Sequence, residues 1–166
     1  MKAFARTSVV SLCVVMAMAC LIVAGQNKHV GTWTIDLSDS KYSPGPAPKD
    51  AKLTIEPSGP DGIKLVAEGQ NADGTPMHVE YVAQFDGKDY PITGFPGADT
   101  VSIKRVDDKT VESEMKAAGK TIMTIRTVLS DDGKTRTSWW KGTNAEGQKV
   151  NNTVVYRRSG GAQKAE

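Results

Sequence analysis

Residues able to carry out acid–base or metal chemistry are few in this 166-residue chain. Its two histidines, His29 and His78, lie far apart, and no histidine or cysteine pair has a spacing familiar from metal sites. There is no Gly-x-Ser-x-Gly segment to present a nucleophile, and no glycine-rich phosphate loop. The sequence therefore predicts no metal, no cofactor and no enzymatic activity, although a catalytic group assembled in space around His78 stays open.

Two arginines are candidates for holding an acidic ligand. Arg126 and Arg136 fall in segments that we predict to be strands. An isolated buried charge is very costly, so an inward guanidinium needs a partner and would anchor an acidic molecule. Exposure of both is the alternative, because arginine is seldom fully buried.

The adjacent tryptophans Trp139 and Trp140 raise a related question. Neighbouring residues of a strand point to opposite faces, so one enters the interior and the other lies outside. We take Trp139 as the interior one. An outward tryptophan marks a contact surface or packs under a loop.

The N-terminal segment 1–25 has the features of an export signal. Lys2 and Arg6 precede an apolar stretch, residues 9–24, that ends in small or compact residues, which predicts cleavage after Gly25 and a secreted or periplasmic protein. An uncleaved membrane anchor is one alternative. Acylation of Cys20 as a lipoprotein is another, although the residues before it match that motif poorly.

Removing this segment changes the charge balance and the cysteine content of the remaining chain. Both cysteines leave with it, and so do two basic residues, which leaves 19 basic and 19 acidic residues. A neutral surface without a basic run argues against nucleic acid as a partner and gives no reason to expect membrane binding. The remaining 141 residues suit one domain, predicted as 26–158, with a disordered tail at 159–166.

Strands are predicted throughout this domain, because apolar residues alternate at period two and never recur at helical spacing over three turns. In 77–85, for example, Met77, Tyr81 and Phe85 share one face. Turn residues separate nine predicted strands, at 30–37, 51–57, 63–70, 76–85, 99–106, 110–117, 120–129, 135–143 and 148–158. Short links favour an antiparallel up-and-down meander that closes into a barrel of about 8–10 strands.

Two connections are longer than hairpin turns. Residues 38–50 contain Pro44, Pro46 and Pro48, so this segment is predicted to run extended over one end as a rim or lid. Residues 89–99 carry Tyr90 and Phe95 and are predicted to be a second such loop, either functional or packed as a plug.

These features resemble the calycin superfamily, which includes lipocalins and fatty-acid-binding proteins. The resemblance lies in Gly31, Thr32 and Trp33 of the first strand and in a last strand that ends in Arg157 and Arg158. It implies that Trp33 closes one end of the barrel under an arginine, for which Arg157 is the candidate and Arg158 the alternative. The chain departs from fatty-acid-binding proteins in having no helices after the first strand and Val154 where their carboxylate-binding arginine stands.

The leading hypothesis is an exported lipocalin-like protein that binds a small apolar or amphipathic ligand inside the barrel. The interior candidates are Tyr81, Phe85, Met115, Met123, Trp139, Arg126 and Arg136, and the residues of barrel closure are Gly31, Trp33 and Arg157. The alternative is a solid barrel that serves as a protein-interaction module, such as an envelope protease inhibitor. Alternation does not distinguish a hollow barrel from a packed one, and it leaves the oligomeric state open.

Overall fold

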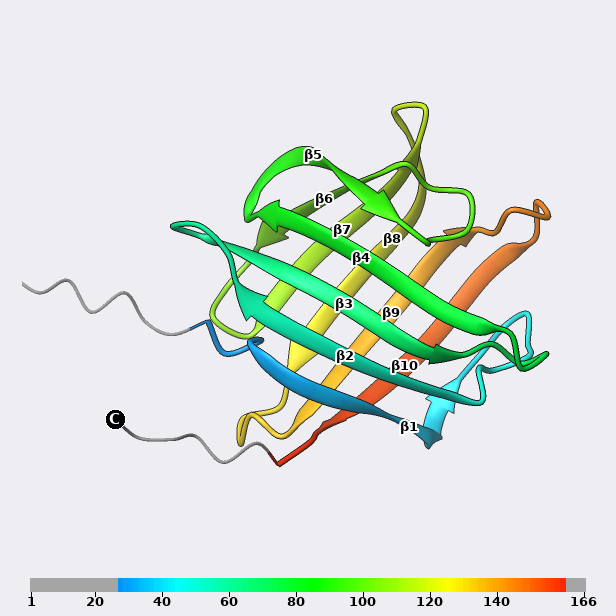
Figure 1. Ribbon diagram of the computed structural model, residues 1–166, viewed down its shortest axis with the longest axis horizontal. Helices are drawn as coiled ribbons and strands as arrows, with labels where there is room; N and C mark the ends of the chain where they lie inside the picture. The colour runs from blue at the N-terminus through cyan, green and yellow to red at the C-terminus, as the bar shows by residue number, and fades with distance from the viewer. Residues whose placement is uncertain (1–26, 161–166) are drawn as a thin grey trace, which may run out of the picture.

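Ten β-strands follow one another in the computed structural model, which describes residues 27–160 (Figure 1). The strands are β1 (Gly31–Lys41), β2 (Asp50–Pro57), β3 (Gly62–Gln70), β4 (Pro76–Gln84), β5 (Asp86–Thr93), β6 (Thr100–Arg105), β7 (Thr110–Ala117), β8 (Lys120–Leu129), β9 (Thr135–Thr143) and β10 (Lys149–Arg158). Within the described residues no helix is long and apolar enough to cross a membrane. The predicted signal segment 1–25 lies outside them.

The sheet closes into a barrel because β1 pairs with both β2 and β10. All the other strands pair antiparallel with their neighbours in chain order. In the closing pair Trp33 lies opposite Arg158, and Ile35 lies opposite Tyr156. The predicted all-β, up-and-down barrel is therefore confirmed, with ten strands, and closure removes the free sheet edges.

Tight turns keep the strands in this order. Between β3 and β4 the Asn71 N–H donates to the Thr75 carbonyl, and Gly74 adopts a φ of 89°. Between β8 and β9 the Ser130 N–H donates to the Thr135 carbonyl, and Gly133 adopts a φ of 67°. Residues with a Cβ are strained in this left-handed region, which explains glycine at both positions.

The prediction of a loop at 89–99 was wrong in its first half, which belongs to β5. Pro91 and Gly87 interrupt the apolar alternation that identifies the other strands, so the sequence pattern does not reveal this one. The pairing of β5 with β4 joins only Glu80 to Thr93 and Tyr81 to Ile92, whereas β5 pairs with β6 over most of its length. The loop itself spans residues 94–99.

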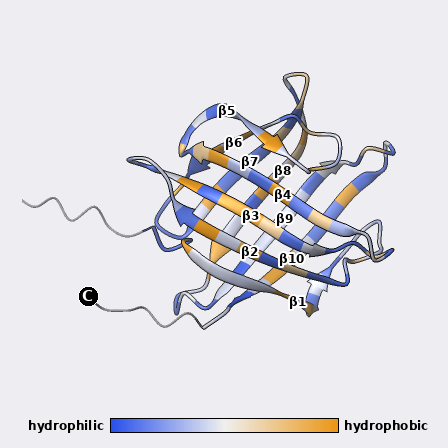
Figure 2. Cartoon of the chain, viewed as in Figure 1, coloured by the Kyte–Doolittle hydropathy of each residue, from blue (hydrophilic) through white to orange (hydrophobic). Residues whose placement is uncertain are grey.

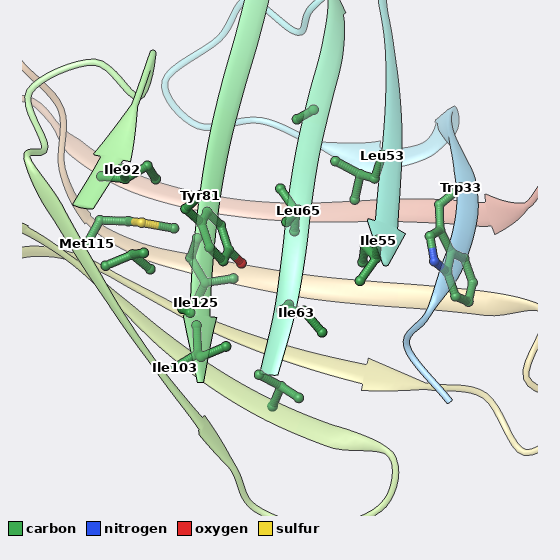
Figure 3. Close-up of a cluster of buried hydrophobic side chains, with 14 of the residues drawn as sticks. Trp33, Leu53, Ile55, Ile63, Leu65, Tyr81, Ile92, Ile103, Met115 and Ile125 are labelled. Carbon is green, nitrogen blue, oxygen red and sulfur yellow. The ribbon is translucent and has the colours of Figure 1, made fainter. Parts of the chain in front are cut away.

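Alternation along the strands places one set of side chains inside the barrel. On β4 the side chains of Tyr81 and Ala83 are buried, and on β8 those of Met123, Ile125 and Leu129 are buried. Figure 2 shows apolar and polar residues in turn along the strands, and Figure 3 shows buried side chains from several strands, among them Trp33, meeting inside the barrel. The sequence pattern of 77–85 correctly predicted the inward face of β4.

The proline-rich connection lies at one rim of the barrel. Its first four predicted residues, 38–41, extend β1, and the remainder, 42–49, leads to β2. The Ser43 N–H donates to Asn152 Oδ1 over 2.9 Å, and the Asn151 N–H donates to the Ser43 carbonyl over 2.7 Å. These bonds fix the connection to β10.

Candidate ligand-binding cavity

Trp33 plugs one end of the barrel. Its side chain is 0% exposed, and its indole Nε1 donates to the carbonyl of His29 over 3.0 Å. The guanidinium of Arg158 lies 4.1 Å from the centre of the indole ring, which adds cation–π attraction to apolar packing. Three hydrogen bonds fix Arg158 over the plug, because its guanidinium also donates to the carbonyls of Lys28, Val30 and Gly133.

The assignment of this role to Arg157 was wrong, and strand register explains why. Arg158 lies directly opposite Trp33 and shares its inner face, whereas Arg157 lies opposite Thr34 and points outward. There Arg157 binds Asp36 Oδ2 at 2.9 Å and also contacts Asp39. Gly31 leaves room for the arginine, because a Cβ at this position would lie 2.5 Å from Nη1 of Arg158.

A cavity of about 720 Å³ occupies the other half of the barrel. Its mouth is formed at the connections between β3 and β4, β5 and β6, and β9 and β10, by Asn71 and Pro76, residues 94–96 and residues 143–146. A second hollow of about 1150 Å³ lies outside the plugged end, where its walls carry Lys28, Lys109, Asp61 and Asp131. The first hollow lies inside the barrel and has a buried, unpaired guanidinium, that of Arg136, in a largely apolar lining, so it is the candidate site.

Four of the predicted interior residues line this cavity: Tyr81, Met115, Met123 and Arg136. Tyr81 reaches it from β4, Met115 from β7, Met123 from β8 and Arg136 from β9. The cavity therefore draws its walls from strands far apart in the sequence.

The other three predicted residues lie elsewhere. Phe85 is buried beyond the end of β4, outside the cavity lining, with the guanidinium of Arg105 4.4 Å from its ring centre. Trp139 is 40% exposed on the outer face of β9. Arg126 lies next to it on the outside of β8, paired with Glu112 Oε1 at 2.5 Å. The inward placement of Trp139 and Arg126 was wrong, because alternation does not give the phase of a strand with polar residues on both faces. Phe85 points inward as predicted, but alternation does not give the depth of an inward residue along the barrel.

Sequence reasoning missed several polar residues of the wall. Trp140, Ser138 and Tyr156 line the cavity, as do Thr127 and Asn152. The inward position of Arg136 fixes that of Ser138 and Trp140, since residues two apart share a face. If one of these three side chains is known to point inward, the other two must do so as well.

Arg136 is the buried charged group of the cavity wall, whereas Glu146 lies exposed at the mouth. It is 8% exposed, its Nε and Nη1 atoms have no hydrogen-bond partner, and none of the ion pairs among residues 27–160 includes it. Burial lowers the pKa of Arg136, while the phenols of Tyr81 and Tyr156 act in the opposite direction. Burial also raises the pKa of both tyrosines to about 12, so they remain neutral hydroxyl groups. The cavity thus contains an unneutralised cation together with two neutral phenols, Tyr156 on the neighbouring strand β10 and Tyr81 on β4.

Towards the mouth the wall becomes aromatic. The rings of Trp140 and Phe95 stack with centroids 6.0 Å apart and planes inclined by 26°. The indole Nε1 of Trp140 is enclosed and has no hydrogen-bond partner. Between Trp140 and Arg136, the Ser138 hydroxyl is bonded to the Thr127 hydroxyl at 2.8 Å, so this pair is already satisfied.

No protein-family model matches the chain, and no curated protein is significantly similar to it in sequence. Among solved structures, the fluorescent protein UnaG aligns with a TM-score of 0.51 and 19% identity over 80% of this chain and 98% of its own. A point mutant of UnaG gives 0.52 and 20% over 81% and 98%. The fold is lipocalin-like. A redesigned β-barrel also aligns, with a TM-score of 0.47 and 15% identity over 80% of this chain and 93% of its own.

At these identities the likeness concerns the fold alone. The function must therefore be argued from the cavity itself.

The two histidines of the lipocalin-like barrel have different surroundings. His78 lies on the outer side of β4, with Glu68 Oε1 3.7 Å from its Nδ1 and Glu80 Oε2 3.5 Å from its Nε2. His29 is 3% exposed beside the plug, and neither ring nitrogen has a hydrogen-bond partner. Within residues 27–160 no group of three or more His, Cys, Asp or Glu is placed to hold a metal ion.

His29 makes the stability of the barrel dependent on pH. Burial, followed by the charges of Arg136, Arg105 and Arg158, lowers the pKa of His29 from 6.5 to about 3. Below pH 6.5 the unfolded chain therefore takes up a proton that the folded chain refuses, so stability falls as the pH falls from 6.5 towards 3. Between pH 7 and pH 5 this contribution amounts to about 2 kcal/mol.

His29→Leu should remove that contribution. Urea unfolding of the wild-type protein and of the variant at pH 7, 6 and 5 measures it, and the stability of the variant relative to wild type should rise as the pH falls. A difference that stays constant over this range would show that His29 does not titrate in the expected way.

Proposed function

We propose that this chain is a binding protein that holds a small amphipathic molecule in the barrel cavity, with an acidic group at Arg136 and an apolar body against the opposite wall. The observation that carries the proposal is the buried guanidinium, which lines the cavity without a carboxylate partner. An isolated buried charge is very costly, and a carboxylate ligand would neutralise it and supply acceptors for its unpaired N–H groups.

The size and lining of the cavity support this proposal. Its volume of about 720 Å³ lies within the range of about 300–1,000 Å³ that is usual for small-molecule sites. Leu53, Leu65, Met115 and Ile125 supply apolar surface. A volume of this kind favours ligand binding over the alternative of a solid barrel that acts only through its loops. The proposal also includes export of the protein, argued from residues 1–25 alone.

Displacement of a fluorescent fatty-acid probe tests the proposal. We expect octadecanoate to displace the probe and octadecan-1-ol, which has the same chain without the charge, to bind about 10-fold more weakly, because a charged hydrogen-bonded pair contributes about 1.5–3 kcal/mol. Equal affinities would contradict the role of Arg136, and no displacement by either compound would contradict the proposal as a whole.

A pair of substitutions locates the site. Ala67 is buried on β3 and lines the cavity, so Ala67→Phe places a ring in the space that the ligand needs and should weaken binding. Val82 is 45% exposed on β4, so Val82→Phe adds the same ring outside and serves as the control. Binding that is equally sensitive to both substitutions would place the ligand elsewhere.

A further inference from the structure

The polar groups of the cavity are concentrated on one wall. Arg136, Ser138 and Trp140 alternate along the inner face of β9, and the neighbouring strands β8 and β10 add Thr127, Asn152 and Tyr156. Around the barrel, β4 lies five strand positions from β9 in either direction, and Figure 1 shows β3 and β4 crossing in front of β8 and β9. The facing wall is mainly apolar, with Leu65 and Ala67 from β3 and Met77 and Val79 from β4, and Tyr81 of β4 adds one phenol to it.

Two residues of the polar wall hold unpaired donors. Among the described residues that line the cavity, the buried side-chain polar atoms without a partner belong to Arg136 and Trp140. An unsatisfied buried donor costs about 1–3 kcal/mol, and a ligand acceptor at each position recovers that cost. Ser138, between them, is already bonded to Thr127.

The spacing of these donors defines the shape of the molecule that satisfies both. Arg136 and Trp140 lie four residues apart on one strand, so their Cα atoms are about 13 Å apart along β9. Phe95, stacked on Trp140, closes the wall at the second position.

We infer that the ligand is an elongated acid with a second hydrogen-bond acceptor about 13 Å from its carboxylate, on the same edge of the molecule. This inference rests on the proposed function and sharpens it. The carboxylate binds Arg136, the second acceptor receives the indole N–H of Trp140, and the apolar body lies against β3 and β4. A simple fatty acid satisfies only the first of these positions.

Octadecanoate and 12-hydroxyoctadecanoate distinguish the two cases. In an extended chain the added hydroxyl lies about 14 Å from the carboxylate, close to the spacing of Arg136 and Trp140 along β9. We expect the wild-type protein to bind the hydroxy acid at least 5-fold more tightly than octadecanoate, as one additional hydrogen bond of about 1 kcal/mol requires. Displacement titration of the full chain with both acids measures this ratio.

Trp140→Phe should abolish the preference and change octadecanoate binding less than 2-fold, because it keeps an aromatic side chain and removes the donor. The adjacent, outward Trp139 provides a matched control, and Trp139→Phe should retain the preference. NMR titration of the wild-type protein gives a second readout. The indole N–H resonance of Trp140 should move downfield with the hydroxy acid and stay in place with octadecanoate. Assignment of that resonance comes from its absence in Trp140→Phe.

The outcomes separate this inference from the function on which it rests. If octadecanoate binds more tightly than octadecan-1-ol but the hydroxy acid gains nothing, the proposed function stands and the second acceptor is wrong. A preference that survives in Trp140→Phe overturns the assignment to Trp140 in the same way. If neither acid binds the wild-type protein, both the proposed function and this inference fail.

Discussion

Trp33→Ala should lower the free energy of unfolding by about 3–5 kcal/mol, the range typical of truncating a large buried aromatic residue. The indole is completely buried, and three kinds of interaction leave with it. These are its apolar packing at the end of the barrel, the hydrogen bond from Nε1 to the His29 carbonyl, and the attraction to the Arg158 guanidinium. The loss should be near the upper limit because Arg158 then lies over an empty space.

Urea unfolding at pH 7, followed by circular dichroism, measures this loss. Trp139→Ala is the matched control, since it removes the same side chain from an outer position that is 40% exposed. That change should cost less than about 1 kcal/mol, as substitutions of exposed residues usually do. A similar cost for both substitutions would contradict the role of Trp33 as the plug of the barrel.

Arg136→Met should raise the stability of the ligand-free barrel and lower its affinity for an acidic ligand. The ligand-free barrel should become more stable by about 2–4 kcal/mol, because an unpaired buried charge is replaced by an apolar side chain of similar length. The affinity for octadecanoate should fall about 30-fold, because the carboxylate then enters an apolar pocket without its partner, while octadecan-1-ol should bind about as before. Stability measured without ligand and displacement titrations with both compounds give the two numbers.

Arg126→Met is the control for this substitution. Arg126 lies on the adjacent strand, half exposed and paired with Glu112, so both stability and acid binding should change little. If Arg136→Met instead destabilises the barrel and leaves octadecanoate binding intact, the guanidinium has a structural partner and is not the anchor of the ligand.

Local sequence patterns predicted the barrel well because the alternation of apolar residues within a strand identifies its buried face. The alternation of Met77, Tyr81 and Phe85 correctly indicated which side of β4 is buried. The glycine and asparagine turns correctly separated most of the strands. Strand β5 was missed because Pro91 and Gly87 break its apolar alternation. Its place is apparent only in the closed barrel, where it lies between β4 and β6.

The site was harder to predict because it depends on long-range register. Whether Arg157 or Arg158 covers Trp33 is decided by the pairing of β1 with β10, two strands more than 100 residues apart in the sequence. The choice between Trp139 and Trp140 depends on the phase of β9, where small polar residues occur on both faces. Phe85 points inward as predicted, but the apolar alternation of its strand does not show that it lies nearer the plug than the cavity.

The positions of residues 27 and 159, close to the first and last residues that the structure describes, have a practical consequence. Asn27 and Ser159 both border the hollow outside the plugged end, and the Ser159 N–H donates to the Thr32 carbonyl over 2.9 Å. The mouth lies at the opposite end of the barrel, so a tag, a fusion partner or an attachment to a solid support, joined next to either residue, points away from the ligand. A biosensor immobilised through residue 27 or residue 160 would therefore keep its opening towards the solution.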